Sequence, residues 1–223
     1  MKRIFQFVII ISSFLLINFS LVFGQEKTIT KKEYTEITEK AFNGVKGKIH
    51  RSIYTLDYFF PPNPTPTRLV KMTREVVPPN KYRLITERFN EKREEIKVGT
   101  RVYVRENDGK WEKDSETLFL MAAENNEKIE EESYKLYEDS ELNGEKVNLY
   151  EKVIKLTNLN NEEGKEKEIH TERYWIKKDG VLVKIENKTD TVGKTSFSLS
   201  TTIYEYDSTI KIEIPRITLR KSK

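Results

Sequence analysis

The sequence predicts a mainly β protein, in which a curved antiparallel sheet of about 10–11 strands is accompanied by two helices. The first observation is the stretch 169–214, where apolar and polar residues alternate and only short Gly, Asp and Asn turns interrupt the runs. The second is a single strong helix signal near residue 30. The third is the lack of the strand–helix–strand spacing that parallel sheets need. A sheet of this kind has to bury one face, which suggests a binding protein more than an enzyme.

The first helix is predicted from Thr30 onward. Thr30 and Glu33 have the spacing of a capping box, in which the Thr hydroxyl and the Glu carboxylate each accept a hydrogen bond from the other's backbone amide. Apolar residues then recur every three or four positions, which places them on one stripe: Tyr34, Ile37, Ala41, Phe42 and Val45. Gly44 and Gly47 mark the end of the helix. We expect this stripe to pack on the sheet, with Ile37 and Ala41 helping to close a cavity.

Strands are predicted over most of the remaining chain, separated by Pro-rich, Gly-rich and Asn-rich turns. The predicted strands cover 48–60, 69–77, 81–89, 93–98, 101–106, 110–113, 134–142, 145–156, 174–176, 181–186, 195–206 and 210–214. The prolines at 61–66 forbid pairing in a sheet, so this segment is a stiff loop.

A second helix is predicted within residues 114–133. Asp114 or Ser115 can cap it, and an acidic run follows an apolar cluster. Leu118, Phe119 and Met121 belong to this cluster, and we expect them to form a helical lid with one dry and one solvated face.

Two strands indicate which residues line a cavity. In 196–203 the apolar residues alternate with Ser and Thr, so that one face is dry and the other wet. Residues 101–105 alternate in the same way. The predicted hydrophobic cavity is lined by Val102, Val104, Phe197, Leu199 and Ile203.

The amino terminus predicts export. Lys2 and Arg3 precede an apolar stretch that ends in small residues, so residues 1–24 form a signal peptide and residues 25–223 a single domain. The alternative is an uncleaved anchor, because about 20 apolar residues can span a bilayer. The chain has no Cys, so it carries neither the acylated cysteine of a bacterial lipoprotein nor a disulfide. We therefore expect a periplasmic or secreted protein.

The sequence offers little that catalysis or nucleic-acid binding requires. Without Lys2 and Arg3, 38 basic residues face 36 acidic ones and the signs are interspersed, so no nucleic-acid footprint is visible. The two histidines, His50 and His170, have no metal-site spacing, and Gly193-Lys194-Thr195 lacks the earlier glycine of a phosphate loop. We predict no cofactor and no enzyme. A hydrolase that uses one of the many carboxylates is the alternative.

Several segments, in this order, resemble the superfamily of LolA-like lipoprotein-sorting proteins and lipid carriers, which includes LolA, LolB, the LppX and LprG group and the sensor domain of RseB. They are Pro79–Arg83, Ile96–Tyr103, Gly109–Trp111, Tyr174–Ile176 and Gly180–Lys184. The chain departs from LolA at Pro78, where the family has an arginine that holds a helical lid closed.

The resemblance implies an open, curved antiparallel β half-barrel with helices covering the concave face and acyl chains held between them. The expected function is that of an exported carrier for a lipid or an acylated lipoprotein, a monomer that exchanges its ligand with a membrane-bound donor or acceptor. The alternative is an RseB-like envelope sensor or structural interaction module with the same fold and no lipid transport.

Overall fold

The computed structural model describes residues 25–63, 65–114, 127–158 and 166–217. These residues form one helix and twelve strands, so the mainly β prediction is confirmed. The elements are β1 (Gln25–Thr28), α2 (Lys31–Lys46), β2 (His50–Phe59), β3 (Thr67–Val77), β4 (Lys81–Arg88), β5 (Glu91–Val98), β6 (Arg101–Glu106), β7 (Glu112–Asp114), β8 (Glu127–Leu142), β9 (Glu145–Asn158), β10 (Glu166–Ile176), β11 (Leu182–Thr191) and β12 (Phe197–Glu205).

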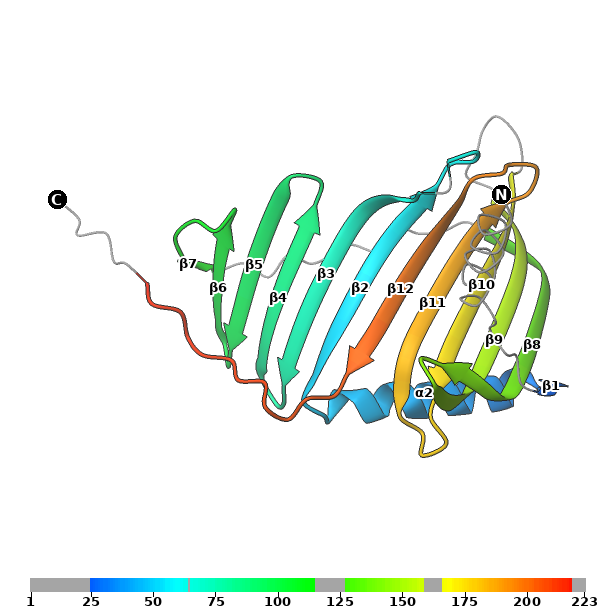
Figure 1. The fold of residues 1–223 in the computed structure, drawn as a ribbon, viewed down its shortest axis with the longest axis horizontal. Coiled ribbons are helices and arrows are strands. Elements are labelled where there is room, and N and C mark those ends of the chain that lie inside the picture. Colours follow the sequence, from blue (N-terminus) through cyan, green and yellow to red (C-terminus); the bar gives the residue numbers. More distant parts are fainter. Residues whose placement is uncertain (1–24, 64, 115–126, 159–165, 218–223) are drawn as a thin grey trace, which may run out of the picture.

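All twelve strands belong to one antiparallel sheet in the order β1-β8-β9-β10-β11-β12-β2-β3-β4-β5-β6-β7. Strand β12 lies in the middle and joins the late strands to the early ones. The sheet is curved and does not close, as an open half-barrel requires (Figure 1). Helix α2 lies across one end of the strands and contacts β8 and β11.

The helix begins as the sequence predicts. The Thr30 amide donates to the Glu33 carboxylate at 2.8 Å, and the Glu33 amide donates to the Thr30 hydroxyl at 3.2 Å, which completes the capping box. The helix ends at Gly47, which caps it, while Gly44 lies inside it. Its buried stripe faces the sheet and consists of Tyr34, Thr38, Ala41 and Val45.

The largest core cluster lies between α2 and the β8–β11 part of the sheet. The aromatic rings of Tyr34 and Tyr134 lie 5.2 Å apart and those of Tyr34 and Tyr174 lie 6.1 Å apart, within the range of favourable ring pairs. Leu182 is fully buried in the same cluster. Ile37 packs against the cluster and Ala41 belongs to it, so both lie on the sheet-facing side of the helix.

The strand register distinguishes two faces, and we call the face that contacts α2 the inner face. One row of directly opposed residues crosses this face from β8 to β3: Leu136, Tyr150, Tyr174, Ile185, Thr202, Tyr54 and Met72. Opposed residues point to the same side of a sheet. The inner face therefore continues without a break beyond the strands that α2 covers.

The outer face carries a row of cross-strand ion pairs. Arg51 donates to Glu75 at 2.7 Å, and Arg83 donates to Glu94 at 2.6 Å. Arg105 donates to the other oxygen of Glu94 at 2.7 Å. Glu94 is only 2% exposed, so two guanidinium groups compensate its buried charge.

Residues 210–214 do not form the strand that their alternation predicts. Both edges of β12 are already paired, with β11 and β2, so the chain that follows has no free edge beside it. Ile210 and Ile212 still point to the same side of the chain, as residues two positions apart do in an extended segment. They are buried against Ile96, on the outer face of β5.

The predicted helix over 114–133 is wrong at its carboxyl end, because residues 127–133 belong to β8. Their glutamates pair across strands, as Glu131 does with Lys155 at 2.7 Å, and Glu130 accepts from Thr157 at 2.8 Å. Cross-strand pairing overrides the helix preference of an acidic run. The predicted lid residues Leu118, Phe119 and Met121 lie outside the described residues.

A short strand at the edge of the sheet was not predicted from the sequence. Residues 25–28, which carry no strand signal in the sequence, add β1 to the edge of β8 and bring the strands to twelve. Within the described ranges, the single helix is neither long nor apolar enough to cross a membrane.

Truncation of Leu182 tests the core between α2 and the sheet. Because Leu182 is fully buried, Leu182→Ala should lower the free energy of unfolding by about 2–5 kcal/mol. The control is Val192→Ala, since Val192 is 56% exposed and should change it by less than about 0.5 kcal/mol. Urea titrations of both variants measure the difference. Equal effects would show that this cluster is not the core of the fold.

Candidate ligand-binding groove

The helix is too short to cover the inner face. Its 16 residues span about 24 Å, since an α-helix rises about 1.5 Å per residue. Twelve strands about 4.8 Å apart span about 53 Å along the sheet. One helix therefore covers roughly five strands, which agrees with a core cluster that draws on β8 to β12. The inner face of β2, β3 and β4 lies beyond it.

Two adjoining hollows lie on this uncovered part of the inner face. The first, of about 380 Å³, is lined by Phe42, Val45, Lys46, His50, Ser52, Arg74, Val76 and Tyr204. The second, of about 300 Å³, is lined by Ser52, Tyr54, Met72, Arg74, Tyr82 and Leu84. Because both include Ser52 and Arg74, they form one continuous depression, which we call the inner groove. Each hollow is within the size range of small-molecule sites.

Alternation along three strands produces the groove. Tyr54 on β2, Met72 on β3 and Leu84 on β4 all point inward. Their immediate neighbours along each strand point outward. Phe42 forms the helical wall and is 45% exposed, although a large apolar side chain is normally buried. The groove is thus mostly apolar and open at its surface.

Tyr82 supplies a polar group at the far end of the groove. Its hydroxyl donates to the Glu95 carboxylate. Burial of the ring, and then this hydrogen bond, raises the pKa of Tyr82 to about 12. Cations flank the same ring, with Arg74 at 5.2 Å and Lys97 at 5.9 Å from its centre.

His50 and Tyr204 close the end of the groove near the helix. The Nδ1 atom of His50 lies 2.9 Å from the carbonyl oxygen of Lys48, and its ring lies 6.0 Å from that of Tyr204. Burial raises the pKa of Tyr204. His50 is therefore a packed core histidine. The other histidine, His170, lies on β10, far from the groove in the sheet order, and its Nε2 atom contacts the Glu168 carboxylate of the same strand. Within the described ranges, no cluster of His, Asp and Glu has the geometry of a metal site.

The five residues predicted to line one cavity are not brought together. Val102 and Val104 do lie on the inner face, because Val104 opposes Glu95, which in turn opposes Leu84. They extend the inner face beyond the groove and do not line either hollow.

Phe197, Leu199 and Ile203 lie on the outer face, and Ile203 is 43% exposed. The expectation that β12 turns these three residues toward a dry interior is therefore wrong. The strand points its serines inward together with Tyr204, whose ring packs on the main core. Cross-strand partners cover the outer side instead: the Phe197 ring stacks on Phe59 at 4.3 Å.

A larger hollow of about 630 Å³ lies on the outer face, beneath the tip of the β8–β9 hairpin, and includes Ile203. Charged groups form much of its wall, and they are paired. Lys177 binds Glu145 at 2.6 Å, and Lys184 binds Glu186 at 2.8 Å. This hollow is therefore bordered by paired charges, whereas the inner groove adjoins the last turn of α2 and contains Arg74, which forms no ion pair within the described part of the chain.

Sequence reasoning missed most groove residues. Met72, Arg74 and Val76 point inward from β3, but these positions mix apolar and charged residues, so the sequence of this strand does not show which side faces the helix. The side of β12 that faces the helix is set by the packing of Tyr204 on the main core, and the aromatic residues of this strand do not reveal it in advance because Phe197 points to the opposite face.

Comparison with known proteins gives structural likeness only. No protein-family model matches the sequence, and no curated protein matches it significantly. Among solved structures, the chain is similar to a LolA superfamily protein from Nitrosomonas europaea, with 11% identity, a TM-score of 0.28 and coverage of 77% of this chain and 91% of that chain.

Two further structures are similar to the same degree. A DUF1329 family protein from Desulfovibrio piger has 10% identity and a TM-score of 0.29, with 81% of this chain and 94% of that chain covered. An outer membrane lipoprotein-sorting protein domain from Vibrio parahaemolyticus has 10% identity and a TM-score of 0.28, with 82% and 95% covered. At such identities the likeness concerns the fold and carries no information on the ligand.

The raised pKa of Tyr82 predicts how its hydroxyl affects stability at high pH. An unfolded tyrosine loses its proton near pH 10, whereas Tyr82 in the folded protein keeps its proton to about pH 12. Its contribution to stability is therefore complete below pH 10 and is lost as the pH rises to 12. The difference in unfolding free energy between wild type and Tyr82→Phe should shrink over this range. A constant difference from pH 9 to 12 would refute the buried, hydrogen-bonded phenol.

Proposed function

We propose that this protein is an exported carrier that holds the apolar part of a lipid or an acylated lipoprotein in the inner groove. The observation that carries the proposal is the groove itself: an apolar depression between the end of a short helix and a wider sheet. The segment Pro79–Arg83, which resembles lipid carriers, contributes Tyr82 to the groove wall.

Apolar burial alone can account for such binding. Each buried methylene is worth about 0.8 kcal/mol, so half a dozen methylenes contribute about 5 kcal/mol before the costs of association. No chemical step is needed. Ser52 and His50 both line the groove, but the Nδ1 atom of His50 lies 2.9 Å from the carbonyl oxygen of Lys48 and no hydrogen bond joins the ring to the Ser52 hydroxyl. We therefore propose binding and release without catalysis or a cofactor, by a monomer that meets a membrane-bound donor or acceptor.

The proposed location is the periplasm or the exterior of the cell, reached through a cleaved signal peptide at residues 1–24. This location suits the chemistry, because lipids and acylated proteins that cross an aqueous compartment need their chains shielded from water.

Single cysteines test the groove directly, since the chain contains none of its own. Met72 points into the groove and Thr73 points to the outer face of the same strand, and both are half-buried. Bound dodecanoate should slow the reaction of a maleimide with the Met72→Cys variant severalfold. It should leave the rate for Thr73→Cys unchanged.

The pair of variants separates the outcomes. Protection of both thiols would indicate a global change in the protein, and protection of Thr73→Cys alone would move the ligand to the outer face. If neither thiol is protected and dodecanoate does not bind, the carrier proposal fails. The same fold would then serve as a sensor or an interaction module.

A further inference from the structure

Arg74 lies at the centre of the inner groove, where the two hollows meet, and its guanidinium is exposed there. It occupies the middle of β3, opposite Ser52 on one side and Leu84 on the other. A charged side chain at the middle of an apolar face is an unusual placement unless something offsets its charge.

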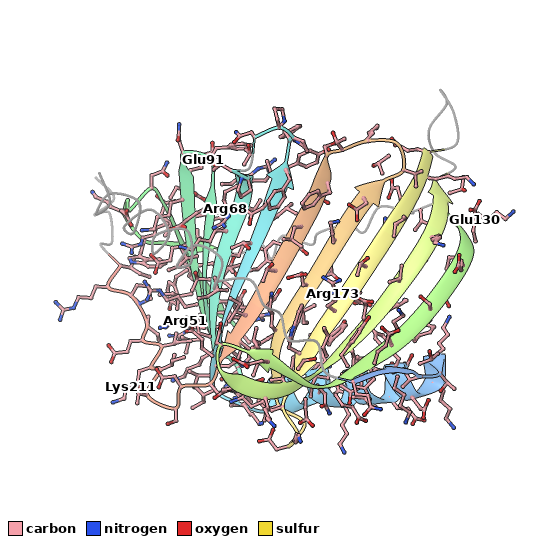
Figure 2. The ribbon with its side chains drawn as sticks, turned by 45° about the vertical axis from the view of Figure 1, so that its right-hand side comes forward. Arg51, Arg68, Glu91, Glu130, Arg173 and Lys211 are labelled. Carbon is pink, nitrogen blue, oxygen red and sulfur yellow. The ribbon has the colours of Figure 1, made fainter. Side chains whose placement is uncertain are left out.

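Several arginines within the strands on the outer face have acidic partners. Arg51 binds Glu75 at 2.7 Å, Arg173 binds Glu151 at 2.7 Å and Arg83 binds Glu94 at 2.6 Å. In the part of the chain that the structure describes, Arg74 has no carboxylate within ion-pair distance. Its contact is the face of the Tyr82 ring, 5.2 Å from the guanidinium carbon. Figure 2 labels two of these outer-face arginines, Arg51 and Arg173, whose partners are Glu75 and Glu151.

The surrounding charges leave the groove positive. In the cross-strand row that contains Arg74, the acidic residue is Glu95, two strands away, and its carboxylate accepts a hydrogen bond from the Tyr82 hydroxyl. Lys46 lines the helical end of the groove, and Lys97 lies 5.9 Å from the centre of the Tyr82 ring. An apolar groove with an unpaired guanidinium at its centre is complementary to a molecule with an apolar chain and an anionic group.

We propose that the ligand of the inner groove is an anionic amphiphile, whose carboxylate or phosphate group binds the guanidinium of Arg74 while its chain occupies the adjoining hollows. This inference rests on the proposed carrier function and specifies its ligand class. Guanidinium suits either anion, because its planar fork of N–H groups matches two oxygens at once.

Calorimetric titration with three amphiphiles of one chain length tests the inference: dodecanoate, dodecyl phosphate and dodecanol. The two anions should bind wild-type protein about tenfold more tightly than the neutral alcohol, the factor that 1.4 kcal/mol gives at 25 °C. Arg74→Gln should remove this preference and leave the affinity for dodecanol unchanged. Arg74→Lys, which keeps the charge and loses the fork, should retain part of it.

The matched control is Arg88→Gln. Arg88 is exposed at the end of β4, and in the described part of the chain its contact is the Phe89 ring at 5.8 Å, not a carboxylate. This variant removes the same net charge but should keep the full preference for anions. Retained dodecanol binding shows in each case that the variant is folded.

The outcomes that overturn the inference differ from those that overturn the carrier function. Equal affinity of wild-type protein for dodecanoate and dodecanol would refute the role of Arg74 and leave the carrier function standing. The same holds if Arg74→Gln and Arg88→Gln lose the same amount of affinity for the anionic amphiphiles. Inorganic phosphate that binds as tightly as dodecyl phosphate would mark a free-anion site and also refute it. Absence of binding by all three amphiphiles would refute both.

Discussion

A mismatch in size governs the part of the structure that is described. Its one helix, of 16 residues, lies on the inner face of a twelve-strand sheet that is about twice as wide as the helix is long. The helix shields β8 to β12, where Tyr34, Ala41 and Val45 pack against the largest core cluster. Beyond its last turn, apolar side chains on β2, β3 and β4 remain at the surface of a depression. A ligand that fills this depression would complete the burial that the helix begins, which gives apolar binding a purely geometric origin.

The outer face is covered by other parts of the chain and not by the helix. Ile210 and Ile212 pack against Ile96 of β5. Val147, Leu149 and Trp175 form a second buried cluster on this face, and cross-strand ion pairs lie on several of the other strands. Glu94 is almost fully buried between two arginines, so removal of either arginine would leave the buried carboxylate with a single partner. The difference between the faces explains why an unpaired Arg74 on the inner face is informative. The outer-face arginines Arg51, Arg83 and Arg173 are paired with glutamates of neighbouring strands.

Local signals in the sequence predicted most of the helix and strand positions, but they did not predict which side of each strand faces the helix. The capping box at Thr30 and the strand over 101–106 are short-range features, and both were found where expected. The direction of β12 depends on Tyr204 meeting the core beneath α2, a contact between residues far apart in the chain. The failure of 210–214 to form a strand depends on β2 having already paired with β12. The groove was missed for the same reason, since the reach of α2 across the sheet cannot be read from periodicity.

The position of a bound chain tests the central claim most directly. A crystal structure of the protein with dodecanoate should show the chain on the inner face, between Phe42 at the end of α2 and Leu84 on β4. Density for the chain in the outer hollow beside Ile203, with the inner groove filled only by water, would contradict the account.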